Sequence, residues 1–460
     1  ADVCAYKHKS LELMLYVDDY LVTGNDEDIE WFTKTANQEF GDCGFEQAEM
    51  FLGMNITRVG EQAYHICMAS YLQAVYERYS KAYKVRPKDL PLPAGYGMNK
   101  ADCPPKGEAI KEPYRQLIGS LAYANLTAWH ASYAISQLAR AQANPSKGHW
   151  ERALETLGMM HKHREVGITY RAGDVERDID LQKKKGKSGI RQPHTATTQV
   201  FADDRLYCYC DGSHADIDTQ PEGQCDCTEC TAKHQQRPED LDCYKTSLAY
   251  VMMYANAPVQ WRSSVSATRH HHSTESEMHA SAEAAKAAQQ LIYFLENWGS
   301  EQRPMRLYTD NAAARKACLH KHGLTKKTAH IPKKAWIARD LAREGTTSIE
   351  KVYTHWNPSD MGTKALCREL YHQHMNMWME KHTPVIKPKK AGAILMRKAE
   401  YLQRMGGGTP LTKEGDEEHG HAQAGKDPRR GPVISMSIAG TGAETSARLS
   451  RPVKRNGGSH

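Results

Sequence analysis

The sequence predicts an α/β (α+β) protein with folded regions of mixed strands and helices and a disordered C-terminal tail. Short apolar runs of strand length, such as residues 11–24 and Met305–Thr309, alternate with helical patterns, such as Asp26–Phe40 and residues 276–298. Of the 460 residues, 40% are apolar, which is enough to fill several cores. No apolar run approaches the ~18 residues of a spanning helix, so we expect no membrane partner.

The first half begins with a predicted hairpin. Residues 11–24 contain an apolar run, the carboxylates Asp18 and Asp19, and a second apolar run, which is typical of two strands with an acidic tip. Helical periodicity follows in Asp26–Phe40, with strands after it. The next expected elements are strands at 50–59 and 63–68 and helices at 71–79, 114–143 and 150–163.

A basic, apolar-poor stretch at 182–199 separates this half from the next and is the expected linker. The second half is expected to contain strands at 206–210, 248–254, 259–263, Met305–Thr309 and 349–355, and helices at 276–298, Ala312–Leu319, 335–343 and near Thr363. A Cys-rich polar insertion occupies 219–242.

The net charge of +6 is unevenly distributed. Residues 383–460 carry a net +7, whereas residues 1–382 carry a net −1. An argument for nucleic-acid affinity from total charge therefore concerns the tail, which is rich in Gly and low in aromatic residues.

The residues around the first hairpin resemble a known family. An Asp-Asp pair alone is a common acidic turn. Here, however, residues 15–24 read Leu-Tyr-Val-Asp-Asp-Tyr-Leu-Val-Thr-Gly, residues 50–56 read Met-Phe-Leu-Gly-Met-Asn-Ile, and residues 114–123 read Tyr-Arg-Gln-Leu-Ile-Gly-Ser-Leu-Ala-Tyr. With Tyr133-Ala134-Ile135 and the segment 144–150, these blocks follow the order found in copia-type LTR retrotransposons. The chain resembles the reverse-transcriptase palm and connection of their Pol polyprotein.

This resemblance implies that Asp18 and Asp19 belong to a polymerase metal site, where divalent ions clamp the attacking and leaving oxygens. The family's third carboxylate and its nucleotide-binding fingers have no match among residues 1–460. RNA-directed DNA polymerase activity is therefore expected of the intact parent polyprotein, with the upstream polymerase half as a missing partner, and not of this truncated chain.

Four further carboxylates recur where predicted elements end or begin: Asp211, Glu277, Asp310 and Asp360. Carboxylates at strand ends and a helix start can converge on one edge of a sheet, where they would repel one another unless cations lie between them. Local explanations also exist. Asp211-Gly212 and Asp310-Asn311 suit turns, Thr274-x-x-Glu277 suits a capping box, and Asp360 suits a helix N-cap.

In this order, the four carboxylates and their neighbours resemble a copia-type ribonuclease H domain, a mixed five-stranded sheet with flanking helices. The matching blocks are 261–263, 273–277, 307–311, 328–331 and 360–366. The resemblance implies that Asp211, Glu277, Asp310 and Asp360 bind two Mg²⁺ and hydrolyse RNA in an RNA–DNA hybrid. Glu275 is the weaker candidate for the second position. His355 and His330 match the family's histidine poorly.

The basic residues Lys326, Lys327, His330, Lys333 and Lys334 are candidates for phosphate contacts, or for a solvated helix face. In the insertion, Cys225, Cys227, Cys230 and His234 offer four ligands for Zn²⁺, although the spacing is cramped and free thiols on a loop are the favoured interpretation. Residues 129–132 read Trp-His-Ala-Ser where the family has Arg-Pro-Asp.

The resulting interpretation has five parts: a partial palm (1–85), a thumb- or connection-like helical region (86–181), a basic linker (182–199), a ribonuclease H-like domain (200–370) and a mostly disordered tail (371–460). Its expected activity is a Mg²⁺-dependent ribonuclease H-type nuclease acting on hybrids, with RNA template and DNA as further partners. The expected location is a virus-like particle in the cytoplasm, or the nucleus. Two alternatives stay open, a catalytically dead or host-retained nucleic-acid-binding fragment and a zinc-dependent interaction module.

We predict that residues 1–460 give no template-dependent DNA synthesis in a primer-extension assay with Mg²⁺, because only two of the polymerase carboxylates have a match. Synthesis that disappears in an Asp18→Asn variant would contradict this prediction.

Overall fold

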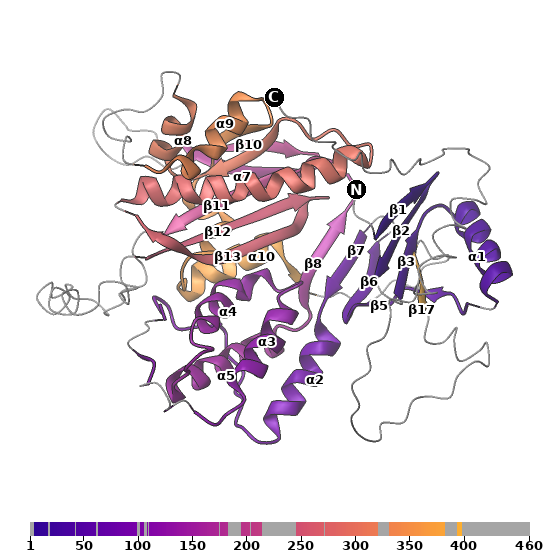
Figure 1. Ribbon diagram of the computed structural model, residues 1–460, viewed down its shortest axis with the longest axis horizontal. Helices are drawn as coiled ribbons and strands as arrows, with labels where there is room; N and C mark the ends of the chain where they lie inside the picture. The colour runs from indigo at the N-terminus through magenta and orange to yellow at the C-terminus, as the bar shows by residue number, and fades with distance from the viewer. Residues whose placement is uncertain are drawn as a thin grey trace, which may run out of the picture.

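The structure is a computed structural model that describes residues 4–16, 19–41, 43–60, 63–98, 102–104, 108, 110–173, 175–182, 195–202, 204–213, 245–270, 272–320, 331–381 and 393–397. Within these ranges, every helix is too short or too polar to cross a membrane. The mixed α/β fold class predicted from the sequence is confirmed (Figure 1).

The N-terminal sheet contains the predicted hairpin. Strands β2 (Leu11–Tyr16) and β3 (Asp19–Thr23) pair antiparallel, with Tyr16 opposite Asp19. Helix α1 (Asp26–Phe40) begins after Asn25, whose side chain accepts a hydrogen bond of 2.8 Å from the backbone N–H of Asp28. The sheet has the order β1-β2-β3-β17-β4. Its remaining strands are β1 (Ala5–His8), β4 (Glu46–Gln47) and β17 (Ala393–Arg397).

A second sheet joins segments that are far apart in the sequence. Its order is β16-β8-β7-β6-β5. The strands are β5 (Met50–Phe51), β6 (Met54–Gly60), β7 (Ala63–Cys67), β8 (Val166–Arg171) and β16 (Glu380–Lys381). Arg171 donates two hydrogen bonds of 2.6 Å to the carboxylate of Glu380, which fixes the β8–β16 end of the sheet.

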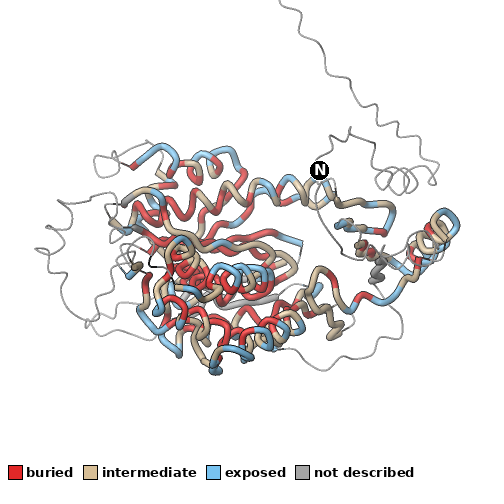
Figure 2. Tube along the Cα trace, turned by 60° about the horizontal axis from the view of Figure 1, so that its bottom comes forward, coloured by how far each residue is buried: buried red, intermediate tan, exposed pale blue. Residues whose placement is uncertain are grey.

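The helical region packs around its own apolar core. It comprises α2 (Ala69–Ser80), α3 (Tyr114–Ala124), the 3₁₀ turn η2 (Trp129–Ala131), α4 (Ser132–Ala139) and α5 (Lys147–Lys162). Leu117, Leu121 and Leu138, whose spacing predicts helices, are fully buried in this core. Figure 2 shows buried residues concentrated in this region and in the sheet that lies against it.

The third sheet is the mixed five-stranded sheet predicted for the second half. Its order is β13-β12-β11-β14-β15. β11 pairs antiparallel with β12 and parallel with β14, β12 pairs antiparallel with β13, and β14 pairs parallel with β15. The strands are β11 (Tyr207–Ser213), β12 (Lys245–Tyr254), β13 (Ala257–Arg269), β14 (Met305–Thr309) and β15 (Thr347–Lys351).

The two faces of this sheet bury different partners, because successive side chains of a strand point to opposite sides. Cys208 and Cys210 face a core shared with α7 (Ser273–Asn297), α8 (Ala312–Leu319) and α9 (Ile337–Arg343). Tyr207 and Tyr209 face a core that includes Trp129 of η2 and residues of α10 (Arg368–Trp378). The sheet therefore lies between two layers (Figure 1).

Some predicted boundaries differ from the observed elements. β11 continues through Asp211 to Ser213, and the short turns η5 (Lys333–Trp336), η6 (Thr354–Trp356) and η7 (Pro358–Gly362) surround α9 and β15. Strands β9 (Val175–Gln182) and β10 (Thr195–Phe201) pair across the expected linker, whose residues 183–194 lie outside the described ranges.

The expected tail begins inside helix α10, where Tyr371, Met375 and Trp378 are buried on one face at helical spacing. Their partners are the sheet residues of the core that contains Trp129. Residues 382–392 and 398–460 of that tail, and the whole Cys-rich insertion at 219–242, lie outside the described ranges.

Replacing Gly158 by Ala should destabilise the protein by roughly 1–3 kcal/mol, because the added Cβ would lie 1.9 Å from the carbonyl oxygen of Arg86. Gly119→Ala is the matched control, since Gly119 also lies within a helix but has open space around the position of its Cβ; it should be neutral or stabilising by up to about 1 kcal/mol. Urea unfolding of both variants measures the difference. Equal stabilities would contradict the close packing of α5 on residue 86.

Candidate metal centre

Four carboxylates reach one edge of the third sheet. Asp211 lies in β11 opposite Ala249 of β12, and Asp310 follows β14 directly. Since β11 and β14 are parallel neighbours, their C-terminal ends share an edge. Asp360, carried by η7, completes a group in which one carboxylate oxygen each of Asp211, Asp310 and Asp360 lie within 4.8 Å of one another. The fourth carboxylate, Glu277, comes from α7.

A glycine allows α7 to approach this edge. An ideal Cβ on Gly212 would lie 2.4 Å from the carbonyl oxygen of Ser276 and 2.8 Å from the backbone nitrogen of Glu277. Any larger residue would push the helix away from β11. Although the dipeptide Asp211-Gly212 suits a turn by its composition, it lies within strand β11. Because Gly212 has no side chain, α7 approaches β11 closely enough to place Glu277 beside Asp211.

Helix α7 begins differently from the sequence interpretation. Its N-cap is His272, whose side chain accepts a hydrogen bond from the backbone N–H of Glu275. The local alternative for Glu277, a capping box with Thr274, is therefore wrong, because Glu277 lies beyond the first turn and its carboxylate faces the cluster. Similarly, Asn357 and not Asp360 caps η7.

Neighbouring polar side chains orient the carboxylates. The hydroxyl of Thr363 donates a hydrogen bond to Oδ2 of Asp211. The hydroxyl of Thr309 donates a 3.3 Å hydrogen bond to Oε2 of Glu277. Lys364 forms an ion pair with Asp360, with 3.2 Å between Nζ and Oδ1. These contacts fix which carboxylate oxygens point into the cluster.

Burial and neighbouring negative charge disfavour the charged forms of Asp310, Asp360 and Glu277. Asp211, Glu277 and Asp360 are 4%, 6% and 1% exposed. Burial, followed by the charge of Asp211, raises the pKa of Asp310 to about 6 and that of Asp360 well above its usual range, with Lys364 opposing both shifts. Burial and the charges of Asp211 and Asp310 likewise raise the pKa of Glu277.

The donor set fits a hard divalent cation. Mg²⁺ takes oxygen ligands at about 2.0–2.1 Å, so two ligand oxygens on one ion lie up to about 4.2 Å apart. The observed limit of 4.8 Å among Asp211, Asp310 and Asp360 is close to this separation. A bound cation would also relieve the repulsion that raises the pKa values. Elsewhere in the described ranges, no other cluster of three His, Cys, Asp or Glu ligands reaches this compactness.

The structure says less about the other candidate site residues, because many of them lie outside the described ranges. Asp19 begins β3 in a half-buried position, whereas Asp18 lies outside the described residues. The zinc candidates Cys225, Cys227, Cys230 and His234, and the basic residues Lys326, Lys327 and His330, also lie outside them. Lys333 and Lys334 are exposed on η5, and His355 is exposed on η6.

Two buried residues of the site were missed from the sequence. Asn357 is fully buried, and its amide donates a 3.1 Å hydrogen bond to the carbonyl of Cys210, which ties η7 to β11 beside Asp211. His374 on α10 is also fully buried and lies close enough to Asp211 to feel its charge; burial lowers the pKa of His374 to about 4 against that charge, so it is neutral near pH 7. Only the three-dimensional neighbourhood distinguishes these residues from ordinary polar surface residues.

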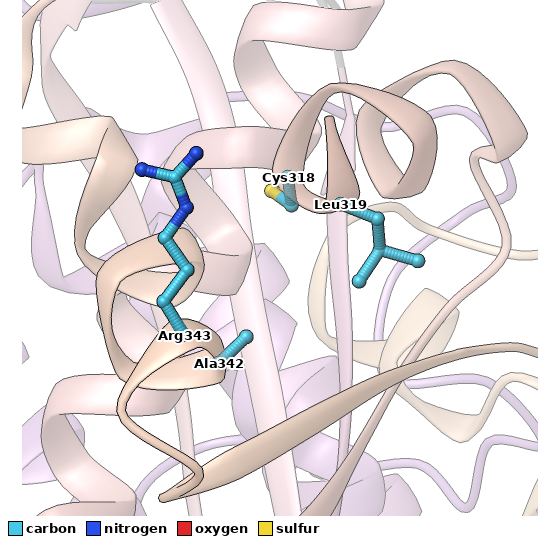
Figure 3. A pocket seen from close by; sticks show the side chains of 4 residues that line it. All are labelled: Cys318, Leu319, Ala342 and Arg343. Atoms are coloured by element: carbon cyan, nitrogen blue, oxygen red, sulfur yellow. The ribbon is translucent and has the colours of Figure 1, made fainter. Parts of the chain in front are cut away.

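Two surface pockets lie away from the carboxylates. One of about 400 Å³ is lined by Cys318, Leu319, Ala342 and Arg343 (Figure 3). Burial raises the pKa of the Cys318 thiol to about 12, so a reactive thiolate does not form there near neutral pH. The other, also about 400 Å³, is lined by residues at the start of β11 and β14, at the sheet edge opposite Asp211.

The raised pKa of Asp310 predicts how stability depends on pH without metal. The folded chain holds this proton to a higher pH than the unfolded chain, so the stabilising contribution is full below the ordinary pKa of 3.8 and is lost as the pH rises towards about 6. In EDTA, Asp310→Asn should therefore be more stable than the unaltered chain above pH 6, by on the order of 1–3 kcal/mol. The two should converge near pH 4. Thermal unfolding across this range measures the difference, and parallel curves would contradict the assignment.

Comparison with known proteins gives three related sequences. The chain is 26% identical over 396 residues to the retrovirus-related Pol polyprotein from transposon TNT 1-94 of Nicotiana tabacum, an alignment that covers 82% of this chain and 26% of the relative. It is 24% and 25% identical to the Pol polyproteins from transposons RE2 and RE1 of Arabidopsis thaliana, covering 83% and 79% of this chain and 22% and 21% of theirs. The chain thus spans about a quarter of the length of these relatives.

Among solved structures, an RNase H1 from Halobacterium salinarum aligns with 14% identity and a TM-score of 0.22, covering 35% of this chain and 94% of that protein. No protein-family model matches the chain. The three sequence similarities confirm that the chain resembles the Pol polyproteins of copia-type retrotransposons, as its motifs indicate.

Proposed function

We propose that the acidic cluster hydrolyses the RNA strand of RNA–DNA hybrids in a Mg²⁺-dependent reaction. The observation that carries this proposal is the convergence of Asp211, Asp310 and Asp360 within 4.8 Å from three separate elements. Similarity to transposon Pol polyproteins supports the class of substrate.

The side chains of the cluster and its neighbours have different roles in this proposal, as ligands, as orienting hydroxyls or as a compensating charge. Asp211, Asp310 and Asp360 would hold the first cation, and Glu277 with Asp211 would hold a second. When bound, Mg²⁺ supplies the activation of water and the neutralisation of charge at the scissile phosphate. Thr363 and Thr309 orient the carboxylates of Asp211 and Glu277, and Lys364 offsets part of the negative charge beside Asp360.

The substrate is expected to be recognised by backbone shape and 2′-hydroxyl groups rather than by sequence. The exposed Lys333 and Lys334 are candidates for phosphate contacts beside Lys326, Lys327 and His330. In the intact polyprotein, Asp18 and Asp19 would belong to the polymerase site, with an RNA template and DNA as partners. The corresponding location is a virus-like particle in the cytoplasm, or the nucleus.

A binding-only fragment is the second candidate. The presence of Trp-His-Ala-Ser at 129–132, where the family has Arg-Pro-Asp, favours it, because such a departure is compatible with a decaying element. It predicts affinity for hybrids without cleavage. A zinc-dependent module built on Cys225, Cys227, Cys230 and His234 is a third, which predicts zinc in the purified protein.

Cleavage of a labelled RNA–DNA hybrid tests the proposal. The full chain should cleave the RNA strand with Mg²⁺ and not with EDTA, and Asp310→Asn should reduce the rate roughly 100-fold or more, because it removes a charged ligand. Asp340→Asn is the matched control, since Asp340 is an exposed carboxylate on α9 outside the cluster. Equal rates for the two variants would remove the metal-site assignment, and hybrid binding without cleavage would favour the binding-only fragment.

A further inference from the structure

Trp129 belongs to the helical region by sequence but to the third sheet by packing. It lies in η2, between α3 and α4, and is fully buried. Its neighbours in the apolar core include Tyr209 and Val251 of the sheet and Met361 of η7. The ring therefore lies on the sheet face opposite α7, directly beside the segment that carries Asp360.

The Trp129 ring packs where a side chain at position 362 would lie, and this space is free because residue 362 is a glycine. An ideal Cβ on Gly362 would lie 2.7 Å from Cη2 and 3.3 Å from Cζ3 of Trp129, and 2.6 Å from Cβ of Ala249. Ala249 is the residue opposite Asp211 in the β11–β12 pair. Gly362, Trp129 and Ala249 thus form one close-packed contact between η7 and the strand next to Asp211.

Gly362, the η7 residue of this contact, lies close in sequence to residues of the acidic cluster. Asp360 precedes Gly362 by two positions, and Thr363, the next residue, donates its hydroxyl hydrogen bond to Asp211. The carbonyl of Gly362 accepts a 2.6 Å hydrogen bond from Ser263 of β13, so the backbone is held on its other side. The depth to which η7 packs on β12 therefore sets the separation of Asp360 from Asp211.

Helix α10 and the residue that follows it contact η2, the turn that carries Trp129. The hydroxyl of Tyr371 donates a 3.3 Å hydrogen bond to the carbonyl of His130, and Nδ1 of His130 lies 3.2 Å from the sulfur of Met379. In the described part of the chain, the indole N–H of Trp129 has no hydrogen-bond partner. The ring contacts η7 through packing of its carbons Cη2 and Cζ3.

We propose that Trp129 is a positioning residue for the acidic cluster: its ring fixes η7 against β12 and so keeps Asp360 at the separation from Asp211 that a divalent cation requires. The proposal rests on the metal site of the proposed function. It assigns to the helical region a direct part in the geometry of that site.

Calorimetric titration of the full chain with Mn²⁺ tests this directly, without hybrid. Trp129→Ala should weaken Mn²⁺ binding about tenfold or more, in the range of residues that orient metal ligands, while Trp129→Phe should retain most of the affinity. Trp150→Ala is the matched control, because Trp150 is a buried tryptophan of the helical core that packs on Tyr79 and Tyr83, away from η7. It should lower the melting temperature and leave the Mn²⁺ affinity unchanged.

Equal Mn²⁺ affinities for Trp129→Ala and Trp150→Ala would overturn the proposal. If Trp129→Ala does not fold, the comparison of Trp129→Leu with Trp150→Leu decides by the same criterion, with a smaller expected loss confined to the first. Mn²⁺ binding that shows this pattern in a chain that does not cleave hybrids would support the proposal while the proposed function fails. A chain that binds no Mn²⁺ would overturn both.

Discussion

The packing of acidic side chains at one edge of the third sheet is the constraint on which the neighbouring structure depends. Asp211, Asp310 and Asp360 lie within reach of a single cation, with Glu277 beside them, and all of them except the half-buried Asp310 are buried. Such a group is costly without a cation. The surroundings keep it together: Gly212 admits α7, Asn357 ties η7 to β11, and the Thr363 hydroxyl donates to Asp211. The site is thus preorganised by contacts that are individually ordinary.

The helical region and the third sheet are also joined next to this cluster. η7 packs against both the sheet and Trp129 of η2, so the helical region contacts the segment that carries Asp360. Further contacts join these regions. Arg368 forms a 2.9 Å ion pair with Asp89, the backbone N–H of Gly95 donates to the carbonyl of Ala365, and β8 pairs with β16. A metal centre assembled from β11, β14, α7 and η7 needs such support, because each element contributes only one carboxylate.

The sequence predicts the bounds of elements that local signals define. It does not predict features that depend on contact with a distant part of the chain. Asp26–Phe40, Met305–Thr309 and Ala312–Leu319 have the predicted bounds, since periodicity and caps define them. Asp211-Gly212 has the composition of a turn, and only the approach of α7 shows why the strand needs a glycine there. Local sequence does not predict that residues 371–378 continue a buried helix, because the surface that buries Tyr371 and Trp378 comes from strands more than a hundred residues away. The four carboxylates could be selected because their order matched a family, whereas Asn357, His374 and Trp129 carry no such signal.

Charge completes the argument about the site. Residues 1–382 carry a net −1, so this part of the chain offers no excess of positive charge to a nucleic acid, whose phosphates would meet a buried acidic edge. Cations held between the carboxylates and the phosphates would reverse this repulsion locally. If substrate phosphates complete the coordination, the affinities for cation and for hybrid must strengthen each other by the same factor, because binding linkage is reciprocal. A residue that sets the spacing of Asp360 and Asp211 then acts on both affinities, although it touches neither ligand.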